Sequence, residues 1–238
     1  MRSLFGAPAR LLATVMILLS ACSQSPTPPQ AAAPVAAADT QGHKELELYR
    51  QLQQEKSYEL AAPIGREIVA KYPQSAAATE VQETLADTSA KAEAIITTRR
   101  LERLWSYQSG KESGGEQNTA SVYSKDAATQ DRVRLVLRRH STWGQSTYLF
   151  GSGKGFECPG ACSLNIRFDA LPPKRMKAYL PETGEPAIFI SDDKAFIERL
   201  DAAQTVSIDV VEKGRGARTL VFEVGGFDAA KFPALKKK

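Results

Sequence analysis

The chain has 238 residues, of which 42% are hydrophobic and 24% charged, enough for one substantial domain and an accessory segment. Its 31 basic and 27 acidic residues give a net charge of +4 without the dominant, clustered excess that nucleic-acid binding requires, so we expect no nucleic-acid partner. Its two histidines do not lie at a ligand-like spacing from any of the three cysteines, which argues against a metal site, and we expect no cofactor.

Residues 1–21 have the composition of a signal peptide. Arg2 and Arg10 supply a positive region, residues 11–19 supply an apolar one, and small residues follow. The apolar run would form a helix of roughly 14 Å, about half of a ~30 Å hydrocarbon core, so we do not expect it to be a spanning anchor.

The segment Leu19-Ser20-Ala21-Cys22 resembles the lipobox of bacterial lipoproteins. That resemblance implies cleavage before Cys22 and acylation of its thiol, and several acyl chains on one residue would hold the protein stably to a membrane. In lipoproteins of this kind, Ser23 in place of aspartate implies release to the outer membrane. We therefore expect a lipid-anchored protein in the outer membrane that faces the periplasm. The alternative is an ordinary signal peptide with an incidental cysteine.

Residues 22–43 contain the Pro/Ala-rich tract "SQSPTPPQAAAPVAAADTQG", which lacks large apolar side chains and cannot bury a core. If this tract is extended at about 3.1 Å per residue, it reaches roughly 60 Å. The composition therefore predicts a tether between the membrane anchor and the folded part.

Residues 44–105 change to helical periodicity. Pro73 ends one predicted helix, and Ser75 is a natural N-cap for the next. The segment "KYPQSAAATE" resembles the helix boundary of tetratricopeptide-like repeats, with one repeat visible. The simpler interpretation is a helical hairpin or coiled-coil stalk, and a homodimer through 76–104 is a further expectation. It depends on a narrow stripe at coiled-coil spacing: Val81, Leu85, Thr88, Ala92, Ile95 and Arg99.

Residues 106–238 predict an antiparallel β-domain. The Gly/Ser-rich segment "SGKESGGEQNTA" (109–120) predicts a linker or loop, and Asp192 and Asp193 are expected to cap a short helix over "KAFIERLDAA". The predicted fold class is α+β: an N-terminal helical hairpin or stalk, then an antiparallel β-sandwich or barrel with one short helix. The strand candidates are the evenly spaced runs "ASVYS", "RVRLVLRR", "STYLF", "LNIRF", "MKAYL", "AIFI", "TVSIDVV" and "TLVFEVGGF".

Cys158 and Cys162 are the two thiols that remain once Cys22 is acylated. In an oxidising compartment two such thiols form a disulfide, and Pro159 and Gly160 between them favour a turn that brings them together. We therefore expect a structural disulfide that closes a hairpin tip. A labile redox pair and half of a metal site are the alternatives.

Residues 105–228 resemble a domain found in many uncharacterised proteobacterial envelope proteins. More loosely, they resemble small β-sandwich envelope proteins such as an accessory protein of type VI secretion and the invasion-associated locus B proteins. The likeness implies a secreted β-rich domain with a disulfide and supplies no catalytic residue. It is carried by Trp105-x-Tyr107, "RLVLRRH" (134–140), "FECPGACSLNIRFD" (156–169), "PAIFISDDKAFIERL" (186–200) and "VFEVGGFD" (221–228).

Arg132, Arg134 and Arg138 share one strand parity, opposite to the apolar residues at 133, 135 and 137. An exposed basic stripe of this kind would suit lipid headgroups, lipopolysaccharide phosphates or an acidic partner. The alternative is a solvated face with acidic partners of its own. Trp105 and the aromatic residues of "TWGQSTY" (142–148) are expected in the core rather than as binding anchors.

No catalytic constellation is visible in the sequence. His140 most simply ends a strand in a turn, and no Gly-x-Ser-x-Gly, His-Glu-x-x-His or phosphate-binding glycine motif is present. The favoured hypothesis is a non-enzymatic, outer-membrane-anchored periplasmic lipoprotein that binds an envelope protein or an anionic envelope ligand. The alternatives are a periplasmic hydrolase with His140 as its base, a hydrolase accessory, or an inhibitor of a foreign hydrolase.

Overall fold

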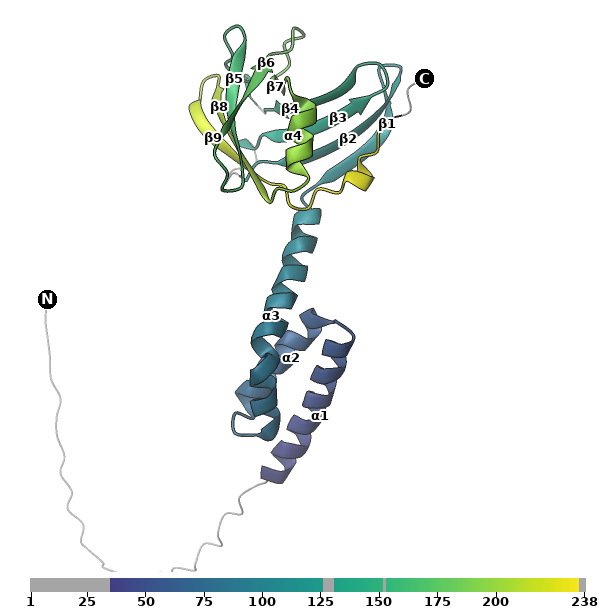
Figure 1. Cartoon of the computed structure of the whole chain (residues 1–238), viewed down its shortest axis with the longest axis vertical. Coiled ribbons are helices and arrows are strands. Elements are labelled where there is room, and N and C mark those ends of the chain that lie inside the picture. Colours follow the sequence, from purple (N-terminus) through teal and green to yellow (C-terminus); the bar gives the residue numbers. More distant parts are fainter. Residues whose placement is uncertain (1–34, 126–130, 152, 236–238) are drawn as a thin grey trace, which may run out of the picture.

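The computed structural model describes residues 35–125, 131–151 and 153–235, so the predicted signal peptide and Cys22 lie outside the described residues. The fold class is α+β, as predicted, with N-terminal helices followed by an antiparallel sheet (Figure 1). Within these ranges no helix is both long and apolar enough to cross a bilayer. The elements are α1 (Val35–Gln54), α2 (Tyr58–Lys71), α3 (Ala76–Glu102), β1 (Ser106–Glu112), β2 (Gly115–Tyr123), β3 (Arg134–His140), β4 (Gly144–Phe150), β5 (Cys162–Phe168), β6 (Lys174–Tyr179), β7 (Ala187–Ile190), α4 (Asp193–Leu200), β8 (Thr205–Glu212), β9 (Gly216–Glu223) and a 3-10 turn at Ala229–Lys231.

The helices α1, α2 and α3 pack into a small bundle with a core of their own (Figure 1). Tyr49 of α1 is 1% exposed, and Gly65 of α2 allows its approach because a Cβ there would lie 2.8 Å from the tyrosine ring. Ser75 caps α3 as the sequence predicts, since its Oγ accepts a hydrogen bond from the Ala78 N–H at 3.0 Å.

The predicted stripe along α3 packs within the same chain. Val81 lies in the core of the helix bundle, and the Thr88 hydroxyl lies 3.1 Å from the Tyr49 hydroxyl. Farther along the stripe, Arg99 forms an ion pair with Glu59 of α2 at 2.8 Å. The stripe therefore covers α1 and α2. A homodimer through 76–104 stays a prediction, and it would use other faces of α3.

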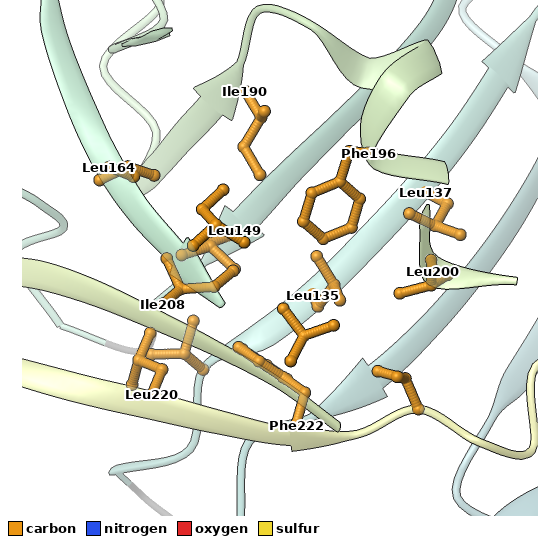
Figure 2. Close-up of a cluster of buried hydrophobic side chains, with 14 of the residues drawn as sticks. Leu135, Leu137, Leu149, Leu164, Ile190, Phe196, Leu200, Ile208, Leu220 and Phe222 are labelled. Atoms are coloured by element: carbon orange, nitrogen blue, oxygen red, sulfur yellow. The ribbon is translucent and has the colours of Figure 1, made fainter. Parts of the chain in front are cut away.

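The strands form one sheet in the order β1-β2-β3-β4-β7-β6-β5-β8-β9, in which all neighbours are antiparallel. Alternate side chains point to the inner face, where they bury a continuous core (Figure 2). The short helix α4 covers this inner face, with Phe196 and Leu200 at 0% exposure. The predicted cap is confirmed at Asp192, whose Oδ1 accepts a hydrogen bond from the Ala195 N–H at 3.2 Å.

The sheet curls until its two ends approach each other. The Lys125 N–H, just after β2, donates a hydrogen bond to the Val221 carbonyl of β9 at 2.7 Å. Close by, the indole N–H of Trp105 donates to the Val224 carbonyl at 3.2 Å, and this tryptophan lies in the core as expected. Of the two predicted arrangements, the barrel therefore describes the sheet better than two stacked layers. Its outer face is convex and lies opposite α4.

The expected loop over 109–120 is wrong, because this segment belongs to a β-hairpin. β1 pairs along its whole length with residues 115–121 of β2. The turn residues Ser113 and Gly114 have φ angles of 44° and 81°, which suits a two-residue hairpin turn. β1 lies at the edge of the sheet, where backbone pairing accepts polar residues that a central strand would not. Its composition therefore gave little sign of a strand.

The helix α3 packs against the segment that follows β9. Leu101 is 7% exposed, and it lies so close to Gly226 that a Cβ on this glycine would be 2.2 Å from the leucine carbonyl carbon. Arg100 forms an ion pair with Glu223 at 2.9 Å, and this hydrogen-bonded pair lowers the pKa of the carboxyl group. Residues 103–105 are all that separate α3 from β1, so the helix is connected almost directly to the sheet.

Candidate functional site

The outer face of the sheet carries a row of stacked aromatic rings. Directly paired residues on neighbouring antiparallel strands point to the same face, and the register aligns Val136 of β3, Tyr148 of β4, Phe189 of β7 and Tyr179 of β6. The Tyr148 and Phe189 ring centres are 4.7 Å apart with an interplanar angle of 27°, and those of Phe189 and Tyr179 are 5.3 Å apart with an angle of 21°. We call Tyr148, Phe189 and Tyr179 the aromatic row.

Trp143 and Arg138 extend the aromatic row toward the turn between β3 and β4. Trp143 is 50% exposed, and its ring stacks on His140 with the centres 3.8 Å apart. The guanidinium carbon of Arg138 lies 5.1 Å from the centre of the Trp143 ring and 5.4 Å from that of Tyr148. Both distances are within the range of a cation–π interaction. The result is one continuous arrangement of rings and guanidinium across four strands.

The expectation that the aromatic residues of 142–148 lie in the core is therefore wrong. The strand parity of β4 points Thr147 and Leu149 inward, at 0% exposure each, and leaves Tyr148 on the outer face. Burial among its neighbours still raises the pKa of Tyr148, although the charges of Arg138 and Arg134 oppose this, so the phenol stays neutral near pH 7. Sequence reasoning missed Phe189 and Tyr179 altogether. A signal was nevertheless present in the sequence. In β6 and β7 the buried inward-pointing positions are apolar, and these two aromatic residues occupy positions that point outward.

The charges on this part of the outer face are basic. The sequences of β3, β4, β6 and β7 contain no aspartate or glutamate. Arg134 and Arg138 lie on the outer face on either side of Val136, whereas Arg132 precedes β3 and is exposed. Within the described part of the chain, neither Arg134 nor Arg138 forms an ion pair with a carboxylate. Glu185, just before β7, is the acidic neighbour of Arg138, whose charge contributes to the lowered pKa of this carboxyl group without an ion pair being formed. The solvated-face alternative would require such ion pairs. The outward basic residues on the four strands are Arg134, Arg138, Arg175 and Lys177.

His140 holds two turns together. Its Nδ1 accepts hydrogen bonds from the backbone N–H groups of Thr142 at 3.1 Å and Trp143 at 3.2 Å, so the ring proton is on Nε2. Nε2 lies 2.9 Å from the Glu112 carbonyl oxygen, to which it donates. The ring is 3% exposed and covers Gly115, where a Cβ would lie 2.4 Å from its Cε1. Both nitrogens are thus engaged with the backbone, an arrangement that suits a structural role.

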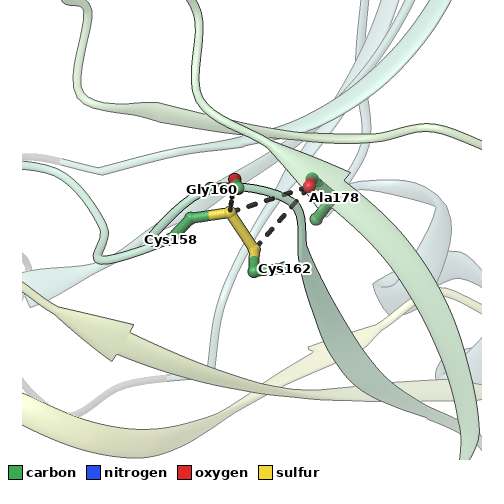
Figure 3. Close-up of a disulfide and its surroundings, with 4 residues drawn as sticks. All are labelled: Cys158, Gly160, Cys162 and Ala178. Atoms are coloured by element: carbon green, nitrogen blue, oxygen red, sulfur yellow. Dashed lines mark hydrogen bonds between the residues drawn. A yellow bond between two sulfur atoms is a disulfide. The ribbon is translucent and has the colours of Figure 1, made fainter.

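Cys158 and Cys162 form a disulfide, as the sequence predicts (Figure 3). Their sulfur atoms lie 3.6 Å and 3.7 Å from the Ala178 carbonyl oxygen of β6, so the bond holds the preceding loop against the sheet. β5 and β8 pair only from Ile166 to Phe168. Beyond that point they diverge, and a groove of about 570 Å³ opens beside the disulfide. Its floor is largely apolar, and Asp209, Arg218 and Thr219 are among its lining residues.

No cluster of three or more histidine, cysteine, aspartate or glutamate side chains that could hold a metal ion occurs among the residues in the described ranges. No protein-family model matches the chain, and no curated protein sequence matches it. Among solved structures, the chain is similar to invasion associated protein B from Bartonella henselae, with 17% sequence identity and a TM-score of 0.38. The similarity covers 53% of this chain and 87% of that one. A likeness at this level identifies neither a family nor a function.

Proposed function

We propose that this protein is a non-enzymatic lipoprotein, anchored in the outer membrane through Cys22 and facing the periplasm. Its β-domain binds another component of the envelope through the aromatic row, Trp143, Arg134 and Arg138. One observation carries this proposal: stacked aromatic rings share an outer sheet face with two arginines that form no ion pair within the described residues, and the four strands of this face lack acidic residues.

The composition of this face supports a binding role. Tryptophan, tyrosine and arginine are the residue types most enriched among those that contribute most to protein–protein affinity. Trp143 and Tyr179 are 50% and 48% exposed, which is a large apolar area to leave in water without a partner. Because the rings stack on one another, they are already ordered. Binding a partner would therefore cost these rings little further side-chain entropy.

The helices and the tether supply reach. α3 has 27 residues, which corresponds to about 40 Å of helix, and it joins the sheet directly. Because α1 begins at Val35, the predicted tether is limited to residues 22–34. At about 3.1 Å per residue it would add about 40 Å if extended, so the β-domain would contact components well beyond the bilayer surface.

Site-specific photo-crosslinking in intact cells tests this proposal. A photoreactive residue at Tyr179 of the full-length protein should give a discrete adduct with an envelope component. The matched control is Leu171 in the turn between β5 and β6, which is 57% exposed but lies outside the aromatic row. We expect the adduct at Tyr179 alone, and we expect it to disappear when Arg134→Glu and Arg138→Glu are combined. No adduct at Tyr179, or the same adduct at both positions, would refute this binding face.

The anchor is tested separately by metabolic labelling with palmitate. The wild-type chain should incorporate label and fractionate with the outer membrane, whereas Cys22→Ala should do neither. Labelling that persists in Cys22→Ala would place the acyl group elsewhere and contradict the lipobox interpretation.

A further inference from the structure

The side chain of Arg138 is held in place on three sides. Trp143 and Tyr148 flank its guanidinium, at 5.1 Å and 5.4 Å from the respective ring centres. Its Nε donates a hydrogen bond to the Ser146 hydroxyl at 3.1 Å. An arginine on a strand surface would otherwise sample many rotamers, so these contacts fix the plane of the guanidinium before any ligand arrives.

This fixed guanidinium keeps most of its hydrogen-bonding capacity. Arginine has five N–H donors, and within the described residues Arg138 uses only the one on Nε, toward Ser146. Glu185 is near enough for the charge of Arg138 to contribute to the lowered pKa of its carboxyl group. Glu185 nevertheless bonds to the Thr183 hydroxyl instead of to Arg138. The two terminal nitrogens of the guanidinium therefore have no protein acceptor in the described part of the chain.

We propose that Arg138 is an anion-recognition residue that binds a carboxylate of an acidic segment in a partner protein. The terminal N–H groups would donate two parallel hydrogen bonds to the carboxylate, while Trp143 and Tyr148 hold the guanidinium in the required plane. This inference rests on the proposed binding function and adds to it the chemistry of the partner.

The way the rings stack favours a protein over a glycan or a nucleic acid. A sugar or a base would stack on an open ring face, but Phe189 lies between Tyr148 and Tyr179, with a ring stacked on each side. One face of Trp143 is likewise covered by His140. The aromatic row thus offers ring edges and hydroxyl groups, which suit the packed side chains of a protein interface.

A lipid surface fits less well. Anionic membranes attract clusters of four to eight lysines or arginines, each contributing a similar amount of binding energy. Here the basic groups surround a convex face, and one arginine is selectively ordered by two rings. Such ordering would give little advantage against mobile headgroups, whereas it favours a carboxylate held at a defined position.

The test uses the mature chain with Cys22→Ala, so that acylation does not drive vesicle binding. Poly-L-glutamate serves as the carboxylate probe, and vesicles of phosphatidylglycerol and phosphatidylcholine serve as the lipid probe. Arg138→Lys keeps the charge but removes the planar pair of donors. The matched control is Arg175→Lys, which makes the same exchange at an exposed position of β6. We expect Arg138→Lys to weaken poly-L-glutamate binding about tenfold and Arg175→Lys to weaken it less than about twofold.

Ser146→Ala gives a second readout that leaves every charge in place. It removes the acceptor that orders Nε, and we expect it to weaken poly-L-glutamate binding about two- to threefold. Equal affinities for the wild type, Arg138→Lys and Ser146→Ala would overturn the proposal. So would binding to phosphatidylglycerol vesicles without binding to poly-L-glutamate, because this would assign the site to a lipid surface.

The outcome for this inference is separable from that for the proposed function. An adduct at Tyr179 that survives Arg138→Lys, together with unchanged poly-L-glutamate affinity, would keep the binding face but reject the role of Arg138. Loss of every Tyr179 adduct in the wild type would reject the binding face itself. Thermal unfolding of each variant shows whether a loss of binding comes from a loss of folding.

Discussion

Gly226→Ala should separate the helical bundle from the β-domain. A Cβ at this position would lie 2.2 Å from the Leu101 carbonyl carbon and 2.3 Å from the Glu102 nitrogen, whereas ordinary contacts begin at 3.4 Å. Both obstacles are backbone atoms of the last turn of α3, so no side-chain rotation relieves the clash. Either the segment after β9 moves, or the end of the helix leaves its position.

The contacts at this junction limit the cost. If the end of α3 leaves, burial of the Leu101 side chain is lost, which is worth about 2 kcal/mol. The exposed Arg100–Glu223 pair adds less than about 1 kcal/mol. If the helix stays, overpacking costs about 1–3 kcal/mol. We therefore expect Gly226→Ala to lower stability by about 1–3 kcal/mol, or roughly 2–12 °C in Tm for a chain of this size.

Thermal unfolding and limited trypsin digestion test this expectation together. Cleavage after Arg103 should become faster in Gly226→Ala, since the junction opens. The matched control is Gly110→Ala on the exposed edge strand, where a Cβ has nothing within 4 Å, and it should change Tm by less than about 2 °C. A Gly226→Ala variant with wild-type Tm and unchanged cleavage after Arg103 would show that the junction is not tightly packed.

Replacing both Cys158 and Cys162 with serine should lower the free energy of unfolding by about 2 kcal/mol, because the disulfide closes a short loop. Mass spectrometry of the protein isolated from its native cells that found two free thiols would contradict this. His140→Ala should lower the free energy of unfolding by about 1–3 kcal/mol, because a carbonyl and two amides lose part-buried hydrogen bonds. A hydrolytic activity that vanishes in this variant while its Tm is unchanged would instead support the catalytic alternative. The Arg100–Glu223 pair should make the junction sensitive to acid. The pKa of Glu223 is lowered in the folded protein, so the pair contributes above the ordinary glutamate pKa of about 4.3 and is lost as the pH falls through the folded value. Unfolding measured from pH 6 to pH 3 should show a small loss, below about 1 kcal/mol, that is absent in Glu223→Gln. An identical pH dependence in both proteins would show that the Arg100–Glu223 pair does not contribute to the acid sensitivity.

Much of the fold follows from local sequence signals. The caps at Ser75 and Asp192 combine a short polar side chain with a following helical pattern, and both form the expected hydrogen bonds. The inner core follows from the alternation of apolar residues in β3, β8 and β9. The disulfide followed from the number and spacing of the thiols, together with the oxidising compartment that the predicted signal peptide implies.

The parts that were missed depend on register and on neighbours. The hairpin of β1 and β2 is polar because its stability comes from pairing at a sheet edge, which composition does not reveal. The aromatic row joins residues from β4, β7 and β6, and β7 reaches its place beside β4 only after the chain has passed through β5 and β6. One sequence shows that Tyr148, Phe189 and Tyr179 are aromatic. It does not show that the strand order places them side by side.

Because the connection between α3 and β1 is short, the number of residues in α3 determines how the β-domain is rotated about the helix axis. Each residue of an α-helix turns about 100° and rises about 1.5 Å. Inserting or deleting a single residue in the solvent-surrounded part of α3 would therefore swing the convex face about a quarter-turn around the helix axis while barely changing its height. The number of residues in α3 thus sets the direction in which the β-domain presents its convex face to a partner.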